Sequence, residues 1–413
     1  MIGTFSGIII FMIAFALGNT LPRFARNAFR VAMLARLSVS VLNVMQHGQM
    51  IGAEADANRF YWTSIERSWN IENLTWDVGK LFDGTYGFMN VHALIQWAFG
   101  VESFFLAHTV SLLGAALCLI LISKIWLLLV PTEYKRLPYV LLIYSLLPSV
   151  LCYQSYVLRE VWQSLCVLGI AWMSLQIQRH GYSVTRIFGI LIFAVVGCFL
   201  HSAAIIMTII GLFFGVMIIN KISVTGLYRR PARLFKYGLI LVLFLLILMP
   251  LFVQSDYLQF DSQLLERAEF NTAGGLKGAR AEYGKLFYSG RPWTLVSAFA
   301  AYQIMPLPWQ FGGIADLVLF VENMFRVLLF LSYLYYRRKL AQFHKDNMDA
   351  IFLMWFMMEL VWSVGTINWG TAARHHVPTI GLLLIVALAS RYLFKSKRRC
   401  ARRHQAAQQL CGQ

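Results

Sequence analysis

The chain has 413 residues, of which 59% are hydrophobic and 13% are charged, and its formal net charge is +17. A water-soluble domain has about a quarter of its residues charged, so this balance excludes the soluble globular class and indicates an integral membrane protein. The positive charge does not indicate nucleic-acid binding, because the basic residues fall between apolar runs and do not cluster on a soluble module.

Long apolar runs recur along the chain. Most are long enough for a helix that crosses a hydrocarbon core of about 30 Å, and they lack the short alternating strands of an outer-membrane barrel. The sequence therefore predicts an all-α, polytopic transmembrane helical bundle. The runs occupy residues 3–18, 104–130, 138–152, 161–177, 187–219, 237–253, 315–335, 350–364 and 377–394.

The first apolar run ends at GNTLPR, with no basic residue before it and no obvious small-residue cleavage site. We expect a retained anchor and not a signal peptide. A second span is expected over 29–46, and polar residues on it recur at helical spacing, which predicts that they face the interior of the bundle. These residues are Arg36, Ser40, Asn43 and His47.

Basic residues set the predicted orientation, because short cytoplasmic loops carry an excess of Lys and Arg. Most basic connections, and the tail at 395–413 with its RYLFKSKRRCARR sequence, are therefore expected in the cytoplasm. Two longer connections differ: 46–88 is acidic, and 254–292 is mixed in charge and rich in Gly, Ser and Asn. Both are expected outside, as long loops of a single catalytic domain that spans 1–394.

Alternation of sides then constrains the number of spans. With the N-terminus outside, the run at 187–219 has basic flanks at both ends and must cross twice, which places His201 near its outer turn. This gives about eleven spans. The segments 88–101 and 293–306 are alternatively re-entrant or flat on the membrane.

Charged residues interrupt an apolar region in the segment YQSYVLREVWQSL, residues 153–165. Arg159 and Gln163 are four residues apart and share a helix face, and Glu160 follows Arg159 directly. An ionisable side chain in a span costs about 3 kcal/mol on insertion scales, so it usually faces the bundle interior or a wet cavity. We interpret Arg159 as a cation at the mouth of an external cavity; the alternative is an interfacial arginine that extends outward with Glu160 as its partner.

The segment GTINWGTAARHHVPTIGLL, residues 365–383, predicts a turn followed by the last helix, with Pro378 in the first helical turn. Arg374, His375 and His376 would then stand just ahead of a helix N-terminus. Free backbone amides and the helix dipole make such a position an anion site. The alternative is simple anchoring of the span.

Further candidate residues belong to other segments expected outside. Each has a plainer alternative, such as a loop charge for Asp56 or a packed core histidine for His201. Arginine forks match phosphate oxygens, and exposed aromatic rings such as Trp62, Trp309 and Trp369 suit the apolar faces of sugars. Together they predict a cavity for an amphiphile with a diphosphate head and a glycan. The remaining candidates are Arg280, Arg291, Glu322 and Asn368.

No cofactor or metal site is expected. The six cysteines show no CxxC or CxxH spacing and lie mostly in apolar runs, so neither a disulfide framework nor a zinc site is indicated.

Several segments carry a family resemblance. They are GAEADANRFY after the second span, YGFMNVHALIQW, LLPSVLCYQSYVLREVWQSL, CFLHSAA, PLPWQ followed by Glu322, and NWGTAARHHVP. In this order they resemble the bacterial repeat-unit polymerases of surface polysaccharides, the Wzy-type O-antigen polymerases and their EpsG-like exopolysaccharide relatives. The similarity runs over nearly the whole chain.

The resemblance implies a GT-C-like helical fold and a reaction at the outer face of the bacterial inner membrane. A growing glycan on undecaprenyl diphosphate would be transferred to the non-reducing end of a new lipid-linked repeat unit. The partners it implies are the undecaprenyl-diphosphate-linked glycan, membrane lipids, a chain-length regulator and a flippase. Because diphosphate is a good leaving group whose charge arginines can stabilise, no metal is obligatory.

This reaction assigns roles to the candidate residues, because the acceptor hydroxyl needs a base and the diphosphate needs cations. Arg159, Arg374 and either Arg280 or Arg291 would bind the diphosphate. The base would be Asp56, Glu160 or His375, with His201 orienting a neighbour. The rest of the substrate-binding set is Gln163, Trp309, Glu322 and Asn368.

Three other functions stay open. A transferase that uses a polyprenyl-monophosphate sugar usually carries an acidic pair early in the first external loop, which AEADA matches loosely after the second span. An O-antigen ligase would attach finished glycans to a lipid core. A lipid-linked oligosaccharide flippase would show related halves and broken helices at mid-membrane, and neither is clear in the sequence.

Overall fold

The computed structural model describes most of the chain as helix. Within the described residues there are 13 α-helices joined by short 3₁₀ turns, and no strand. The predicted all-α class is therefore confirmed for this part of the protein. The described residues are 2–50, 56–72, 84–100, 102–181, 183–200, 292–366 and 369–411.

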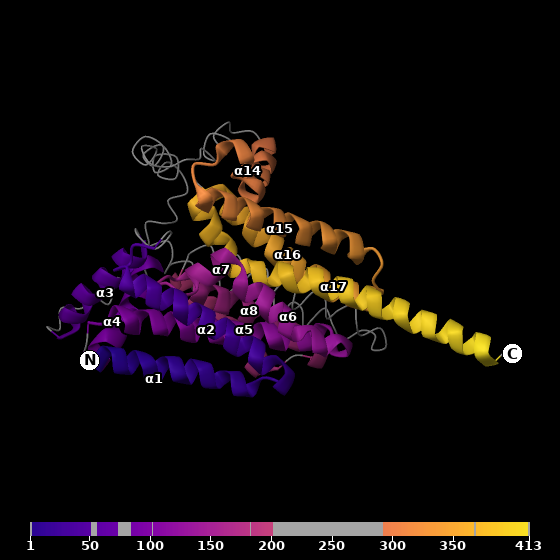
Figure 1. The fold of residues 1–413 in the computed structure, drawn as a ribbon, viewed down its shortest axis with the longest axis horizontal. Helices are drawn as coiled ribbons and strands as arrows, with labels where there is room; N and C mark the ends of the chain where they lie inside the picture. The colour runs from indigo at the N-terminus through magenta and orange to yellow at the C-terminus, as the bar shows by residue number, and fades with distance from the viewer. Residues whose placement is uncertain are drawn as a thin grey trace.

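The helices form two neighbouring groups, with the last helix extended along both (Figure 1). In the first group α1 packs on α5, α5 on α8, α8 on α9, and α3 on α4; in the second, α15 and α16 pack on α17. The first group contains α1 (Ile2–Ala16), α2 (Arg23–Met45), α3 (Asp56–Glu72), α4 (Gly84–Phe99), α5 (Phe104–Leu129), α6 (Leu137–Leu146), α7 (Pro148–Tyr153), α8 (Glu160–His180) and α9 (Val184–Leu200). The second contains α14 (Pro292–Ile304), α15 (Ile314–Arg337), α16 (Gln342–Gly365) and α17 (Trp369–Cys411).

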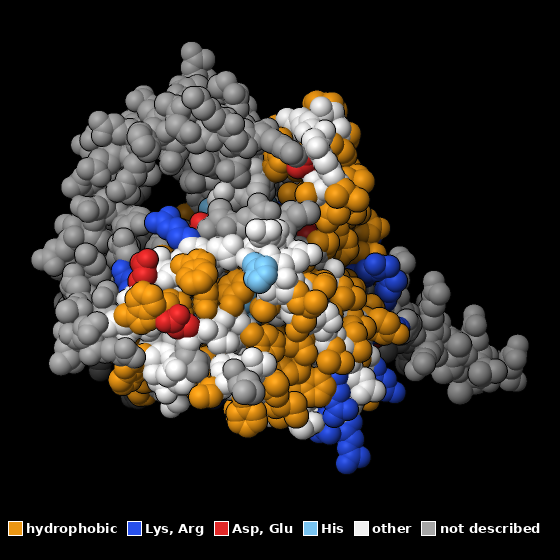
Figure 2. Space-filling model, turned by 60° about the vertical axis from the view of Figure 1, so that its left-hand side comes forward, with side chains coloured by type: hydrophobic (Ala, Val, Ile, Leu, Met, Phe, Trp, Pro, Cys, Tyr) orange, Lys and Arg blue, Asp and Glu red, His pale blue; other side chains and the backbone are white. Residues whose placement is uncertain are grey.

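Four segments are long and apolar enough to cross a membrane: Ile2–Thr20, Arg23–Met45, Phe104–Leu129 and Trp369–Ser396. They agree with the predicted multi-pass membrane class. Large hydrophobic side chains are exposed on the surface, as expected where a bundle faces lipid (Figure 2). Phe5 on α1, for example, is 66% exposed.

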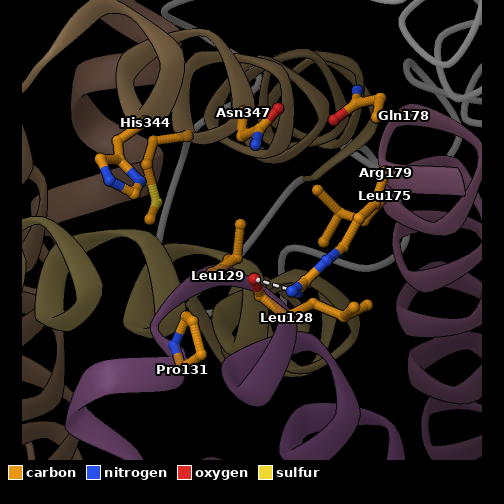
Figure 3. Close-up of a pocket in the computed structure, with 9 residues that line it drawn as sticks. Leu128, Leu129, Pro131, Leu175, Gln178, Arg179, His344 and Asn347 are labelled. Carbon is orange, nitrogen blue, oxygen red and sulfur yellow. Dashed lines mark hydrogen bonds between the residues drawn. The ribbon is translucent and has the colours of Figure 1, made fainter.

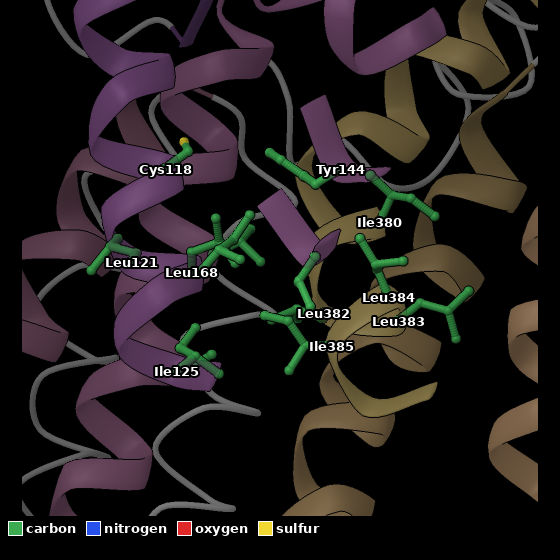
Figure 4. Close-up of a cluster of buried hydrophobic side chains, with 14 of the residues drawn as sticks. Cys118, Leu121, Ile125, Tyr144, Leu168, Ile380, Leu382, Leu383, Leu384 and Ile385 are labelled. Atoms are coloured by element: carbon green, nitrogen blue, oxygen red, sulfur yellow. The ribbon is translucent and has the colours of Figure 1, made fainter. Parts of the chain in front are cut away.

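The core lies where α17 passes between the two groups. The side chains of Tyr144 on α6 and Leu168 on α8 approach this helix at Gly381 (Figure 4). Four consecutive residues of α17, Leu382 to Ile385, are all fully buried. Since consecutive residues point to different sides of a helix, α17 is surrounded on all sides here and is the central element of the bundle.

The polar residues predicted to face inward on α2 do so with one exception. Arg36, Ser40 and Asn43 are fully buried, and Arg36 donates to Gln154 Oε1 at 3.0 Å. The prediction for His47 is wrong, because α2 ends at Met45 and His47 has a positive φ of 51° in the following turn, where it is exposed.

The predicted span over the apolar run 138–152 is broken. α6 ends at Leu146 and α7 begins at Pro148, with Leu147 extended between them. Proline disfavours the helical conformation at the residue before it, and Leu147 directly precedes Pro148, which accounts for the break. The chain then leaves helix until α8 begins at Glu160.

The predicted start of the last helix, with Pro378 in its first turn, is wrong as well. α17 runs without interruption from Trp369 to Cys411, over 43 residues, so Pro378 lies inside the helix and not in its first turn. Arg374, His375 and His376 are consequently helical residues and not residues ahead of an N-terminus. Neighbouring helices in a membrane bundle make an internal proline tolerable.

Candidate functional site

An arginine lies between two carboxylates that are far apart in the sequence. Arg374 of α17 donates from Nε to Glu160 Oε1 at 2.9 Å and from Nη2 to the same oxygen at 2.5 Å. Its Nη1 donates to Asp56 Oδ2. We name these three residues, together with Arg159, the arginine–carboxylate cluster. Arg159 is included because it immediately precedes Glu160 in the chain.

Helix starts position both carboxylates. Asp56 is the first residue of α3 and Glu160 the first of α8, and a negative side chain is stabilised at the positive end of a helix dipole. Arg159 is the residue that caps α8, and its Nη1 donates to the Leu200 carbonyl at 3.4 Å. The cluster thus joins α3, the start of α8, the end of α9 and α17.

A small apolar core packs against the arginine–carboxylate cluster. Ala57 and Phe60 of α3 belong to it, as do Ala373 and Val377 on either side of Arg374. The non-helical stretch before α8 is also packed into it, since Tyr156, Val157 and Leu158 are fully buried. This packing fixes the position of Arg159 and Glu160 at the start of α8.

The exposed fraction of the side chains increases from one end of the cluster to the other. The side chain of Glu160 is 2% exposed, that of Arg374 is 14% exposed and that of Asp56 is 40% exposed. Glu160 Oε2 is buried and makes no hydrogen bond within the described residues. The cluster therefore has a closed end at Glu160 and an open end at Asp56, where a ligand can reach a carboxylate.

The charges in this cluster balance, with two guanidinium groups and two carboxylates. All three bonds of Arg374 go to carboxylate oxygens, so its main effect is to hold Asp56 and Glu160 in place. Arg159 donates to the Leu200 carbonyl, and the planar fork of an arginine suits the oxygens of an anion. The cluster can bind an anion at Arg159 and offer a carboxylate at Asp56.

Other predicted site residues lie close in sequence but are engaged differently. Gln163 is buried one turn into α8. His375 Nδ1 lies 2.8 Å from Thr366 Oγ1, and its ring stacks on Trp362 at 5.7 Å. His375 is therefore held against the end of α16.

Glu322 and Trp309 are separate from the cluster. Glu322 of α15 accepts hydrogen bonds from the Ser149 amide at 2.9 Å and from the Ser149 hydroxyl. It therefore fastens α15 to the start of α7. Trp309, in the 3₁₀ turn Pro308–Gln310, is 79% exposed. The remaining predicted residues, His201, Arg280, Arg291 and Asn368, lie outside the described residues.

Of the aromatic residues predicted for sugar binding, Trp62 on α3 is 60% exposed. Trp369 is buried, and its Nε1 donates to Asp316 Oδ1 at 3.1 Å. That bond fixes the start of α17 against α15. The Tyr61 ring packs 4.7 Å from Phe104, and burial raises the pKa of Tyr61 to about 12, so its hydroxyl is neutral.

Sequence reasoning missed a second buried polar cluster, centred on Glu359 of α16. Its Oε2 accepts from His376 Nδ1 at 2.5 Å and from Gln303 Nε2 at 2.7 Å, and its Oε1 accepts from the Thr379 hydroxyl. The signal was present, because Glu359 is an acid inside the apolar run 350–364 and such an acid needs a partner. This cluster ties α14, α16 and α17 together.

Neither a search for metal ligands nor comparison with known proteins assigns a function to the site. Among the described residues no group of three or more His, Cys, Asp or Glu side chains is placed to hold a metal ion. No family model, no curated protein and no solved structure matches the chain. The site therefore has to be interpreted from its own chemistry.

Proposed function

We propose that this protein is a glycosyltransferase of the bacterial inner membrane that polymerises lipid-linked oligosaccharide repeat units. It transfers the growing glycan from undecaprenyl diphosphate to the non-reducing end of a new lipid-linked repeat unit. The observation that carries the proposal is the arginine–carboxylate cluster, in which Arg374 holds Asp56 and Glu160 beside Arg159. An anion-binding cation and an accessible carboxylate are the groups that this reaction needs.

The orientation of two helices supports an outer location for the cluster. α8 begins at Glu160 in the cluster and ends with Arg179 and His180. α17 carries Arg374 near its start and becomes strongly basic after the apolar part. Because basic residues gather on the cytoplasmic side, the cluster lies toward the outside, within a topology of about eleven spans.

Exposure selects a base among the candidates. Asp56 is 40% exposed, whereas Glu160 is 2% exposed and bound twice by Arg374. We therefore assign Asp56 as the group that accepts the proton of the acceptor hydroxyl. The acceptor oxygen forms a bond to the anomeric carbon of the growing glycan while the bond from that carbon to the diphosphate oxygen breaks.

Arginine stabilises the leaving group in this mechanism. The diphosphate leaves with the bonding electron pair, and the Arg159 guanidinium neutralises the charge that develops on it. Arg374 is a positioning residue, because all its hydrogen bonds go to the two carboxylates. His201, Arg280, Arg291 and Asn368 stay predictions for the parts of the site outside the described residues.

Purified protein with a synthetic lipid-linked repeat unit tests this function directly. Wild type should release undecaprenyl diphosphate and form a ladder of polymers without any ion gradient. Asp56→Asn and Arg159→Gln should each lower the rate by about a hundredfold or more. Arg338→Gln is the matched control, because Arg338 is exposed at the end of α15, remote in sequence from the cluster. Normal polymer formation by Asp56→Asn would refute the assignment.

A flippase is the second candidate, because the break between α6 and α7 is a feature that transporters use. In transporters, the free amides at such a break face the substrate. Here the Ser149 amide at the start of α7 is taken by Glu322, which favours the transferase. Gradient-free turnover separates the two, since a flippase releases no undecaprenyl diphosphate.

A further inference from the structure

A cavity of about 160 Å³ lies between the ends of α5, α8 and α16 (Figure 3). It is remote from the arginine–carboxylate cluster, because Glu160 and Gln178 lie about 27 Å apart along α8 at a rise of about 1.5 Å per residue. Leu128, Leu129 and Leu175 provide apolar wall. The proposed function makes no use of this cavity.

The cavity lies at the level where helices leave the membrane core. α5 ends at Leu129, α8 ends at His180 and α16 begins at Gln342. Lipid headgroups occupy this level of a bilayer. The nearby basic residues, among them Arg136 and Lys345, place it at the cytoplasmic leaflet.

Two amide side chains in the lining have buried carbonyl oxygens without hydrogen-bond donors in the described structure. Gln178 is 8% exposed and lines the cavity, yet its Oε1 has no hydrogen-bond partner within the described residues. The Oδ1 of Asn347, also in the lining, is buried and equally unsatisfied there. A buried carbonyl oxygen without a donor is destabilising, so both positions favour a ligand that brings donors.

The charge of the lining is positive. Arg179 is exposed and donates from Nη1 to the Leu128 carbonyl at 3.2 Å, the dashed contact in Figure 3. Burial lowers the pKa of His344, so its imidazole is neutral at pH 7. None of the residues that line this cavity is a carboxylate. A net negative ligand therefore fits better than a zwitterion, whose cationic group would find no carboxylate to pair with.

We propose that this cavity binds the phosphoglycerol headgroup of an anionic phospholipid from the cytoplasmic leaflet. The Arg179 guanidinium contacts the phosphate, as its planar fork suits phosphate oxygens. The glycerol hydroxyls donate to Gln178 Oε1 and Asn347 Oδ1, and the glycerol carbons contact the leucine wall. A volume of about 160 Å³ holds a headgroup and leaves the acyl chains in the bilayer.

Native mass spectrometry of the full-length protein in detergent tests the proposal. Phosphatidylglycerol, phosphatidylethanolamine and phosphatidylcholine with identical acyl chains are titrated separately. Phosphatidylglycerol should bind most tightly, and Arg179→Gln and Gln178→Leu should each weaken it about tenfold, the loss expected for a hydrogen bond to a charged or buried group. Arg338→Gln removes a charge from an exposed position outside the lining and should leave phosphatidylglycerol binding unchanged.

Gln178→Glu separates recognition from a general loss of structure. A carboxylate at this position repels the phosphate and pairs with an ammonium, so phosphatidylglycerol should weaken while phosphatidylethanolamine tightens. Equal binding of the three lipids to wild type would overturn the proposal and leave a cavity filled by water. Undiminished phosphatidylglycerol binding by Arg179→Gln, or an unchanged lipid ratio in Gln178→Glu, would overturn it too.

Discussion

Replacement of Arg374 by Gln tests whether the arginine–carboxylate cluster is built as described. The change leaves Glu160 as a carboxylate that is 2% exposed and has lost both of its hydrogen bonds to Arg374. An uncompensated buried charge of this kind costs about 3–5 kcal/mol. Asp56 is 40% exposed, so loss of its bond to Arg374 adds about 1 kcal/mol at most.

A double-mutant cycle separates these two contributions. Glu160→Gln removes the stranded charge, so the double variant Glu160→Gln/Arg374→Gln should be more stable than Arg374→Gln alone. We expect a coupling energy of about 2–3 kcal/mol between Arg374 and Glu160. The coupling between Arg374 and Asp56, measured with Asp56→Asn, should be below about 1 kcal/mol because water screens the exposed carboxylate.

The free energy of unfolding in mixed detergent micelles, titrated with SDS, is the quantity to measure. Arg338→Gln is the control for loss of one exposed positive charge. Polymer ladders of the same variants report activity separately. If Arg374→Gln is no less stable than Arg338→Gln, or if the two couplings are equal, then Glu160 is not the buried partner and the reasoning from burial fails.

The other predictions concern the helices around the cluster. Glu359→Leu removes the acceptor of three hydrogen bonds, from Gln303, His376 and Thr379, and should lower the free energy of unfolding by about 3–5 kcal/mol, whereas Glu359→Gln should cost less. Trp62 is 60% exposed, so the cysteine of Trp62→Cys should react with an impermeant maleimide on intact cells. The cysteine of Lys345→Cys should react only after permeabilisation. The reverse pattern would contradict the topology. Gly169→Leu should cost about 1–3 kcal/mol in the same SDS titration, because even a Cβ there lies 2.6 Å from the Phe193 ring.

The class of the protein was predictable because it depends on local composition. Long apolar runs at 3–18, 104–130 and 377–394 mark three of the four candidate spans. The second candidate span, Arg23–Met45, begins earlier than the predicted 29–46. Arg23 directly follows Pro22 and Arg26 lies in the next turn, so the helix begins at basic residues that a hydropathy argument assigns to a loop.

The start of α17 was not predictable from local signals. Gly, Asn and Thr before Pro378 favour a turn, yet the chain is helical from Trp369. The Trp369 Nε1 donates to Asp316 on α15, and this contact with another element helps to fix the earlier start. Tertiary contacts of this kind override turn propensity, and a membrane bundle tolerates the internal proline.

The members of the arginine–carboxylate cluster were singled out by the sequence, but their pairing was not predictable from it. Asp56, Arg159, Glu160 and Arg374 all stood out as charged residues beside apolar runs. However, Arg374 is 214 residues from Glu160 and 318 from Asp56 in the chain, and no local spacing encodes a contact at such separation. The sequence therefore assigned Arg374 to the diphosphate, whereas the positioning role that we propose for it depends on its hydrogen bonds to Glu160 and Asp56.

Hydrogen-bond satisfaction distinguishes the arginine–carboxylate cluster from the other buried acids. Both oxygens of Glu322 accept from Ser149, and both oxygens of Glu359 accept from neighbouring helices. Glu160 has one oxygen bound twice and one without a donor in the described structure, and Asp56 is open to solvent. Saturated acids fasten helices, whereas an incompletely satisfied acid beside an exposed one has capacity left for a ligand, which is why we locate the function here.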